Sequence, residues 1–316
     1  MSNAYIHSLQ TRKRNSYLTM KNANIHPRWH MARLIRSIQP TEAETARSSG
    51  HMGTIRRRLN RSFDIARILP IGSFSRSTAI TRYSDRDLLV MLKRNEAKWG
   101  SNFVSSSTIL RRVRDDLDSR YSATTVRSDR QAAVVHFAGG RHRFDIVPAV
   151  FSHFDNKRPI YGIPDGEGGW LATSPSSHNQ WLKRAQNRSG GKLTKTAQML
   201  KYWANMRTAT TALSSFYLEL WLALSGLCVG ARSYTEILTD VFSQLDQTGC
   251  PPVQDPIGIS GWVHPTHTET QHLNARDAIR TCTFHAERAL VAERRKNNRE
   301  ANRQWNIVFN GGFALS

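Results

Sequence analysis

Two aspartates at the start of an apolar segment have the spacing of metal ligands. Asp85 and Asp87 are separated by one residue and lead into the apolar run "LLVML". Side chains two residues apart on a strand point to the same face, so these two carboxylates lie close enough to repel each other. A hard divalent cation relieves that repulsion by binding carboxylate oxygens. Asp85 and Asp87 are therefore candidate ligands for Mg²⁺ or a similar ion.

A third aspartate occurs in a second apolar segment. Asp145 is the only acid in "RFDIVPA", where Phe144 and Ile146 flank it. If this strand neighbours the one that follows Asp85 and Asp87, three carboxylates converge. Two ions held there would serve an in-line phosphoryl displacement, one by activating the attacking hydroxyl and one by neutralising a triphosphate.

A short glycine-containing segment before the acids suits phosphate binding. Gly72 and Ser73 open the stretch "GSFSRST". A turn of this kind brings backbone N–H groups close to phosphate oxygens, and the Ser73 hydroxyl adds a donor. Arg76 adds positive charge. A lone D-x-D or Gly-Ser pair is common at solvated strand ends and turns, so the combination carries the hypothesis.

The overall charge indicates an anionic partner. The chain of 316 residues holds 45 Lys+Arg against 24 Asp+Glu, a formal charge of +21. Such a balance favours nucleotides, nucleic acid or an acidic surface, and the alternative is a solvated basic coat.

The cysteines and the apolar runs give no sign of secretion or membrane insertion. Three cysteines without paired spacing argue against a disulfide framework and a cysteine zinc site, which fits a reducing, cytoplasmic location. The most apolar run, residues 216–230, is too short for a bilayer and contains Glu219. We expect a buried helix there, with Glu219 paired to an Arg or Lys.

The periodicity predicts an α/β first half and a helical second half. A capping box of Thr41 and Glu44 opens the first predicted helix. We expect helices over 41–62, 107–121, 192–206, 212–228 and 270–297, strands over 65–70 and 86–93, a turn at 72–78, and a hairpin over 132–150 that turns at Gly139–Gly140. Residues 151–191, rich in Gly, Pro, Ser and Asn, are expected to form a long irregular connector.

These motifs together resemble a known family. "GSFSRSTAITRYSDRDLLVML" and "RFDIVPA" resemble the signature of nucleotidyltransferases with a polymerase-β-like core. "PDGEGGWLATSPSSH", "KLTKTAQMLKYWANM", "SSFYLELW" and "ANRQWNIVFNGGF" follow in the order seen in bacterial CD-NTases. Those enzymes are relatives of cyclic GMP-AMP synthase and oligoadenylate synthase that make nucleotide second messengers in anti-phage (CBASS) systems.

The resemblance implies a fold and a domain division. The expected class is α+β, with a polymerase-β-like nucleotidyltransferase core of mixed sheet and helices, a C-terminal helical lobe, and an active-site cleft between them. Residues 1–30 would form a flexible basic arm, 31–165 the catalytic core with its N-terminal helix, and 166–316 an oligoadenylate-synthase-like helical lobe.

The resemblance also implies roles for individual residues. Asp85, Asp87 and Asp145 would hold two Mg²⁺ ions, which Mn²⁺ can replace, and Asp145 would help activate the acceptor hydroxyl. The phosphates would contact Gly72, Ser73, Arg76, Lys201 and Ser215, and Phe216 would stack on a base. Lys201 facing water and Phe216 packing in the core are the plainer alternatives. Trp170, Trp203, Trp305 and Phe309 are assigned to packing.

Three functions follow from these observations. The first is condensation of nucleoside triphosphates, ATP with itself or another nucleotide, into a cyclic or short linear oligonucleotide that a separate effector protein reads. The second is an RNA or tRNA terminal nucleotidyltransferase, for which the basic surface would bind nucleic acid or a regulatory partner. The third is a non-catalytic nucleic-acid-binding protein on the same fold, which the presence of all three acids disfavours.

Overall fold

The chain divides into two compact units. The computed structural model describes residues 25–121, 124–137, 142–207 and 212–313. One unit, here called the sheet unit, comprises Pro40–Arg184 and Gln254–Val263. The other, the helical unit, comprises Met1–Gln39, Ala185–Val253 and His264–Ser316. The described residues thus combine a mixed sheet with helices, which confirms the expected α+β class.

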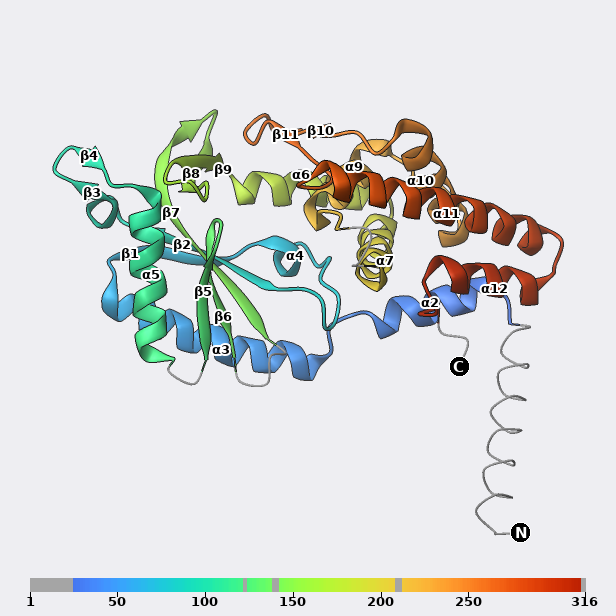
Figure 1. Ribbon diagram of the computed structural model, residues 1–316, viewed down its shortest axis with the longest axis horizontal. Helices are drawn as coiled ribbons and strands as arrows, with labels where there is room; N and C mark the ends of the chain where they lie inside the picture. The colour runs from blue at the N-terminus through green and yellow to red at the C-terminus, as the bar shows by residue number, and fades with distance from the viewer. Residues whose placement is uncertain (1–24, 122–123, 138–141, 208–211, 314–316) are drawn as a thin grey trace, which may run out of the picture. The chain divides into compact units, whose positions relative to one another are not determined.

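The sheet unit is built on a mixed sheet in the order β1-β2-β7-β6-β5 (Figure 1). The central strands β2 (Arg86–Leu92) and β7 (Arg143–Asp155) are parallel. The flanking strands β1 (Ile65–Pro70), β6 (Ala132–His136) and β5 (Thr125–Asp129) pair antiparallel. The second half of β7 pairs with β8 (Arg158–Pro164), which pairs with β9 (Trp170–Thr173).

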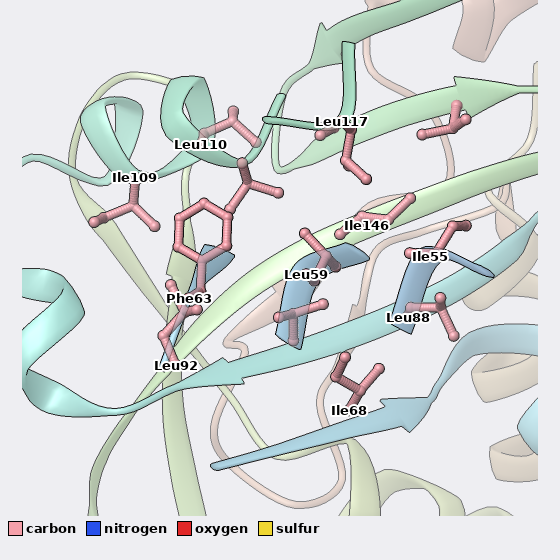
Figure 2. Packing of buried hydrophobic residues seen from close by; sticks show 14 of the residues in the cluster. Ile55, Leu59, Phe63, Ile68, Leu88, Leu92, Ile109, Leu110, Leu117 and Ile146 are labelled. Carbon is pink, nitrogen blue, oxygen red and sulfur yellow. The ribbon is translucent and has the colours of Figure 1, made fainter. Parts of the chain in front are cut away.

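Two helices cover one face of this sheet. α3 (Glu42–Ser62) and α5 (Ser106–Arg120) contribute Ile55, Leu59 and Leu117 to a cluster that includes Leu88 of β2 and Ile146 of β7 (Figure 2). These side chains are almost fully buried. Thr41 and Glu44 cap α3 reciprocally, as the sequence predicts.

The opposite face of the sheet has a separate apolar cluster. Leu89 and Met91 of β2 and Val147 and Ala149 of β7 belong to it. Because side chains alternate along a strand, Asp87 and Asp145 share this face with them. The acids therefore lie on the side of the sheet away from α3 and α5.

Two helices with extensive buried faces belong to the helical unit. α7 (Lys192–Met206) and α9 (Ser215–Ser225) bury most of their residues, and both were predicted from the sequence. Trp203, Trp305 and Phe309 are fully buried, as expected for packing residues. Other helices among the described residues of this unit are α2 (Pro27–Ser37), α10 (Tyr234–Thr248), α11 (Glu269–Arg294) and α12 (Asn298–Val308). No helix within the described ranges has the length and apolar character needed to cross a bilayer.

The expectation of an irregular connector over residues 151–191 is wrong. β7 continues to Asp155, and β8, β9 and α6 (Pro175–Arg188) follow. The glycines that suggested a loop have local roles: Gly166 and Gly168 turn the chain with φ of +96° and +103°. Gly162 lies within β8, where a Cβ would come 3.2 Å from the Trp170 ring. Composition alone did not separate such positions from a true loop.

Other boundaries differ in smaller ways. Gly72–Ser75 forms the short helix α4 rather than an open turn, and β10 and β11 (Val253–Gln254 and Trp262–Val263) were not predicted, nor were α2, α10 and α12. Residues 1–24 of the expected arm and the hairpin turn at Gly139–Gly140 lie outside the described residues, while Pro27–His30 belongs to α2. The antiparallel pairing of β6 with β7 confirms the hairpin strands.

A distant segment completes the sheet unit. Asp255 is buried and accepts hydrogen bonds from the backbone N–H groups of Ile257, Ile259 and Ser260 at 3.1, 3.0 and 2.8 Å. Its Oδ1 lies 3.0 Å from His178 Nε2 on α6. Residues 254–263 are thus tied to α6 through one carboxylate.

The Asp255→Asn substitution should destabilise the protein by about 1–3 kcal/mol, because an amide leaves part of this buried hydrogen-bond set unsatisfied. Urea unfolding at neutral pH measures the loss. Asp115→Asn, an exposed acid of the same unit, is the matched control and should change stability little. Equal stability of the two variants would contradict the role of Asp255.

Acid should remove the stabilisation that the contact between Asp255 and His178 gives the folded protein. Burial raises the pKa of Asp255, but the hydrogen bonds from Ser260 and Ile257 and the nearby His178 more than offset it, so the pKa is lowered. Burial lowers the pKa of His178 below its ordinary 6.5. A group whose pKa is lower in the folded protein than in the unfolded chain stabilises the fold at pH values above its ordinary pKa. That stabilisation is lost as the pH falls through the pKa of the folded protein. The stability gap between wild type and Asp255→Asn should therefore narrow as the pH falls below 3.8, the ordinary pKa of Asp255, because only this carboxyl is missing from the variant and His178 is present in both proteins.

Candidate active site

Strand register brings the predicted acids together. In the parallel pair of β2 and β7, Asp87 is the direct partner of Asp145. Asp85 precedes β2 by one residue and shares the face of Asp87. Asp85, Asp87 and Asp145, here called the acidic edge, therefore lie at the beginnings of the two central strands.

Gly72 packs directly against the acidic edge. Its φ is +65°, and a Cβ placed there would lie 1.8 Å from Asp87 Oδ2. The backbone N–H of Ile71 donates to the Asp87 carbonyl oxygen at 2.9 Å. Only glycine leaves room for the Asp87 carboxylate in this conformation. The structure thus places the predicted Gly72–Ser73 segment beside Asp87.

Hydrogen bonds fix the short helix α4 and the residues that follow it. Ser75 Oγ donates to the Gly72 carbonyl at 2.8 Å, and Asn179 Nδ2 of α6 donates to Ser75 Oγ at 3.1 Å. The Thr78 N–H donates to the Ser73 carbonyl at 2.9 Å. Arg76 ends the turn as its C-terminal cap. The backbone that carries Ser73 and Arg76 is therefore fixed on both sides.

A cation that the sequence analysis did not single out lies among the acids. Arg143 donates to both oxygens of Asp145, from Nε at 2.7 Å and Nη2 at 2.9 Å. Its Nε lies 3.5 Å from Asp85 Oδ2, and its Nη2 donates to Asp129 Oδ2 at 3.2 Å. Arg143 therefore contacts three carboxylates from three separate segments.

The acidic edge is electrostatically strained despite this arginine. Burial raises the pKa of Asp85 to about 6, with Asp145 and Asp129 adding to the effect and Arg143 opposing it. A raised pKa means that the charged form is disfavoured in this position. Such a carboxylate gains from any further positive charge nearby.

The donor set suits a divalent metal ion. Within the described residues, no three Asp, Glu, His or Cys side chains already converge as a metal site. The chemistry nevertheless fits, because carboxylate oxygens are the ligands that Mg²⁺ prefers. The position of Arg143 shows that a cation is accommodated between Asp85 and Asp145.

The remaining predicted site residues belong to the helical unit. Lys201 on α7 is buried and forms an ion pair with Glu219 on α9. This confirms the expectation that Glu219 pairs with a basic residue. Ser215 is exposed at the start of α9, and Phe216 beside it is half-buried rather than part of the core. Their nucleotide contacts stay predictions.

Sequence reasoning missed Arg143, Asp129, Ser75 and Asn179. One signal was available for Arg143, since it is two residues before Asp145 and so shares its strand face. Asp129 and Asn179 gave no such signal, because they reach the site only through strand pairing and helix packing.

Gly72→Ala should destabilise the protein by about 1–3 kcal/mol through strained backbone and displacement of Asp87. Gly50→Ala is the control, because Gly50 lies within α3 and a Cβ there meets nothing within 4 Å. That variant should be as stable as wild type or more stable, since alanine favours helix. Urea unfolding compares the two, and a Gly72→Ala protein as stable as Gly50→Ala would contradict the packing.

Glu219→Ala should cost about 3–5 kcal/mol, because it leaves the buried Lys201 without this partner. The double variant Lys201→Met/Glu219→Leu fills the space with apolar side chains and should recover most of that loss. Thermal and urea unfolding measure both proteins. A Glu219→Ala protein as stable as the double variant would contradict the prediction that Glu219 is needed to balance the buried charge of Lys201.

Known proteins resemble this chain in sequence and in fold. The profile of the SMODS family, the Second Messenger Oligonucleotide or Dinucleotide Synthetase domain, matches residues 27–187. A cyclic AMP-AMP-AMP synthase of Escherichia coli (strain MS 115-1) is 27% identical over 197 residues. That match covers 59% of this chain, and the chain spans 58% of that relative's length.

Two solved structures have the same architecture. The E. coli CdnC structure with ATP aligns with a TM-score of 0.72 at 20% identity, covering 92% of this chain and 99% of CdnC. The Bradyrhizobium diazoefficiens CD-NTase CdnG in complex with GTP aligns with a TM-score of 0.67 at 14% identity, covering 90% and 98%. These likenesses confirm the expected fold. Because the family profile matches more than half of its residues, the chain belongs to the SMODS family of nucleotidyltransferases, and the CD-NTase resemblance is confirmed.

Proposed function

We propose that this protein uses divalent metal ions to condense nucleoside triphosphates into a cyclic or short linear oligonucleotide, with release of pyrophosphate. The observation that carries the proposal is the pairing of Asp87 with Asp145 in register, with Asp85 on the same face. Gly72, which leaves room for the Asp87 carboxylate, supports it.

The acidic edge has the groups that this chemistry needs. Asp85, Asp87 and Asp145 would hold two Mg²⁺ ions, which Mn²⁺ can replace and which would supply charge neutralisation for the phosphates. The acceptor hydroxyl oxygen forms a bond to the α-phosphorus as the bond to pyrophosphate breaks, without a protein nucleophile. Asp145 helps to activate that hydroxyl, while Gly72, Ser73 and Arg76 bind the donor phosphates.

Residues of the helical unit would bind the rest of the nucleotide. In this proposal Lys201 and Ser215 contact the triphosphate and Phe216 stacks on a base. Stacking tolerates different bases and is worth about 1–3 kcal/mol per base. Lys201 would then have two roles, the buried ion pair with Glu219 and the contact with phosphate. The Lys201→Met/Glu219→Leu variant separates them, because a raised KM for nucleotide in a well-folded protein supports phosphate binding.

The name of one relative suggests the substrate. The E. coli relative is named a cyclic AMP-AMP-AMP synthase, which favours ATP as a substrate here. The product would act as a second messenger in anti-phage signalling, read by a separate effector protein.

The charge of +21 favours an RNA end as an alternative acceptor for the nucleotide. Transfer of a nucleotide to an RNA end uses the same acids, and the basic surface would bind the RNA backbone. Such binding weakens steeply with salt, because it depends on phosphate contacts.

Asp85→Asn/Asp87→Asn should abolish product formation, because neutral amides bind Mg²⁺ poorly. The assay incubates purified protein with four nucleoside triphosphates and Mg²⁺ or Mn²⁺, treats the mixture with phosphatase, and identifies resistant oligonucleotides by mass spectrometry. Asp115→Asn/Asp118→Asn removes the same charge from the exposed face of α5 and should leave the product unchanged.

The two acceptor hypotheses give different results in this assay. A resistant oligonucleotide that disappears only in the Asp85→Asn/Asp87→Asn protein supports the synthase. Nucleotide addition to supplied RNA, with no product from free nucleotides, would replace it with the RNA-modifying function.

A further inference from the structure

Arg143 connects the acidic edge to an acid outside it. Its guanidinium contacts Asp85 and Asp145, which are members of the edge. The same group also contacts Asp129, the last residue of β5, at 3.2 Å. Three carboxylates from β5, β7 and the segment before β2 thus share one arginine.

We propose that Arg143 is a resident counter-ion that competes with divalent metal for Asp85 and Asp145, and that Asp129 retains the arginine when metal takes those oxygens. This inference rests on the proposed metal-dependent function and assigns roles to Arg143 and Asp129 within it. Both act as positioning residues for the acidic edge.

The competition follows from the hydrogen bonds of Asp145. Nε and Nη2 of Arg143 donate to its two oxygens at 2.7 and 2.9 Å. This two-pronged pairing engages both oxygens with a strong, charge-assisted bond. A metal ion bound to Asp145 draws charge from the same oxygens and repels the guanidinium, so it weakens these bonds and favours movement of the arginine toward Asp129.

Asp129 provides the second position for the arginine. Nη2 contacts Asp129 and Asp145 at once, at 3.2 and 2.9 Å, so a small movement of the guanidinium exchanges one acid for the other. Arg143 and Asp145 are two residues apart on β7 and share a face, so the arginine stays beside the edge in either position. An arginine kept there is suited to contact phosphate oxygens.

Mn²⁺ titration without nucleotide tests the competition, followed by electron paramagnetic resonance of free Mn²⁺ and by the thermal shift that Mn²⁺ produces. Arg143→Gln should bind Mn²⁺ about tenfold more tightly than wild type, because a nearby positive charge is gone. Its unfolding temperature in chelator should fall, and Mn²⁺ should raise it more than in wild type. Arg114→Gln removes a partly exposed arginine of the same unit, whose ion pair is with Asp115, and should leave both readouts unchanged.

The Arg143→Lys variant keeps the charge but loses the two-pronged geometry. Its Mn²⁺ affinity should lie between wild type and Arg143→Gln, and it keeps the test informative if the glutamine variant folds poorly. An Mn²⁺ affinity equal to or weaker than that of wild type, in whichever of the two variants folds, would overturn the proposed competition between Arg143 and the metal.

Asp129→Asn tests the retaining role. In the wild-type background it should weaken Mn²⁺ binding, because the displaced arginine loses its second partner. In the Arg143→Gln background the same substitution should have a clearly smaller effect. Equal effects in both backgrounds would show that Asp129 acts only through its own charge.

Failure of this inference is distinguishable from failure of the proposed function. A protein that makes the oligonucleotide, but whose Mn²⁺ affinity is indifferent to Arg143, overturns the inference and leaves the function standing. A protein in which neither wild type nor Arg143→Gln binds Mn²⁺, and which makes no product, overturns both.

Discussion

The parallel pairing of β2 with β7 is the constraint on which the candidate site depends. One register places Asp87 opposite Asp145, and a slip of a single residue would turn one of them to the other face of the sheet. Burial specifies that register, because Leu88 and Ile146 pack under α3 and α5 while Leu89 and Val147 pack on the other side. The apolar core therefore aligns the acids.

Concentrating acids at one edge raises an electrostatic cost that the surroundings partly offset. Arg143 contacts Asp85 and Asp145 and offsets part of their negative charge. Gly72 has no side chain and so leaves room for the Asp87 carboxylate. The pKa of Asp85 is still raised by burial and by its acidic neighbours. The edge is thus poised to take up more positive charge, which is the property that a metal-dependent phosphoryl transfer needs.

The sequence was informative where a pattern is local. The D-x-D spacing and the lone Asp145 predicted that the acids lie on neighbouring strands, and Asp87 is paired with Asp145. The capping box of Thr41 and Glu44 predicted the start of α3. Long-range contacts were not predictable: Asn179 supports the α4 turn from 104 residues away, and Asp255 ties a separate segment to α6. The strands within residues 151–191 were missed because glycines that serve turns and close packing look, in composition, like those of a loop.

Anomalous scattering from crystals grown with Mn²⁺ and a non-hydrolysable ATP analogue would show whether the three aspartates bind metal, because it locates the ion without reference to activity. We expect Mn²⁺ peaks bounded by Asp85, Asp87 and Asp145, with the triphosphate beside Gly72 and Ser73 and with Arg143 paired to Asp129. Nucleotide bound with no metal peak at these three carboxylates would contradict it.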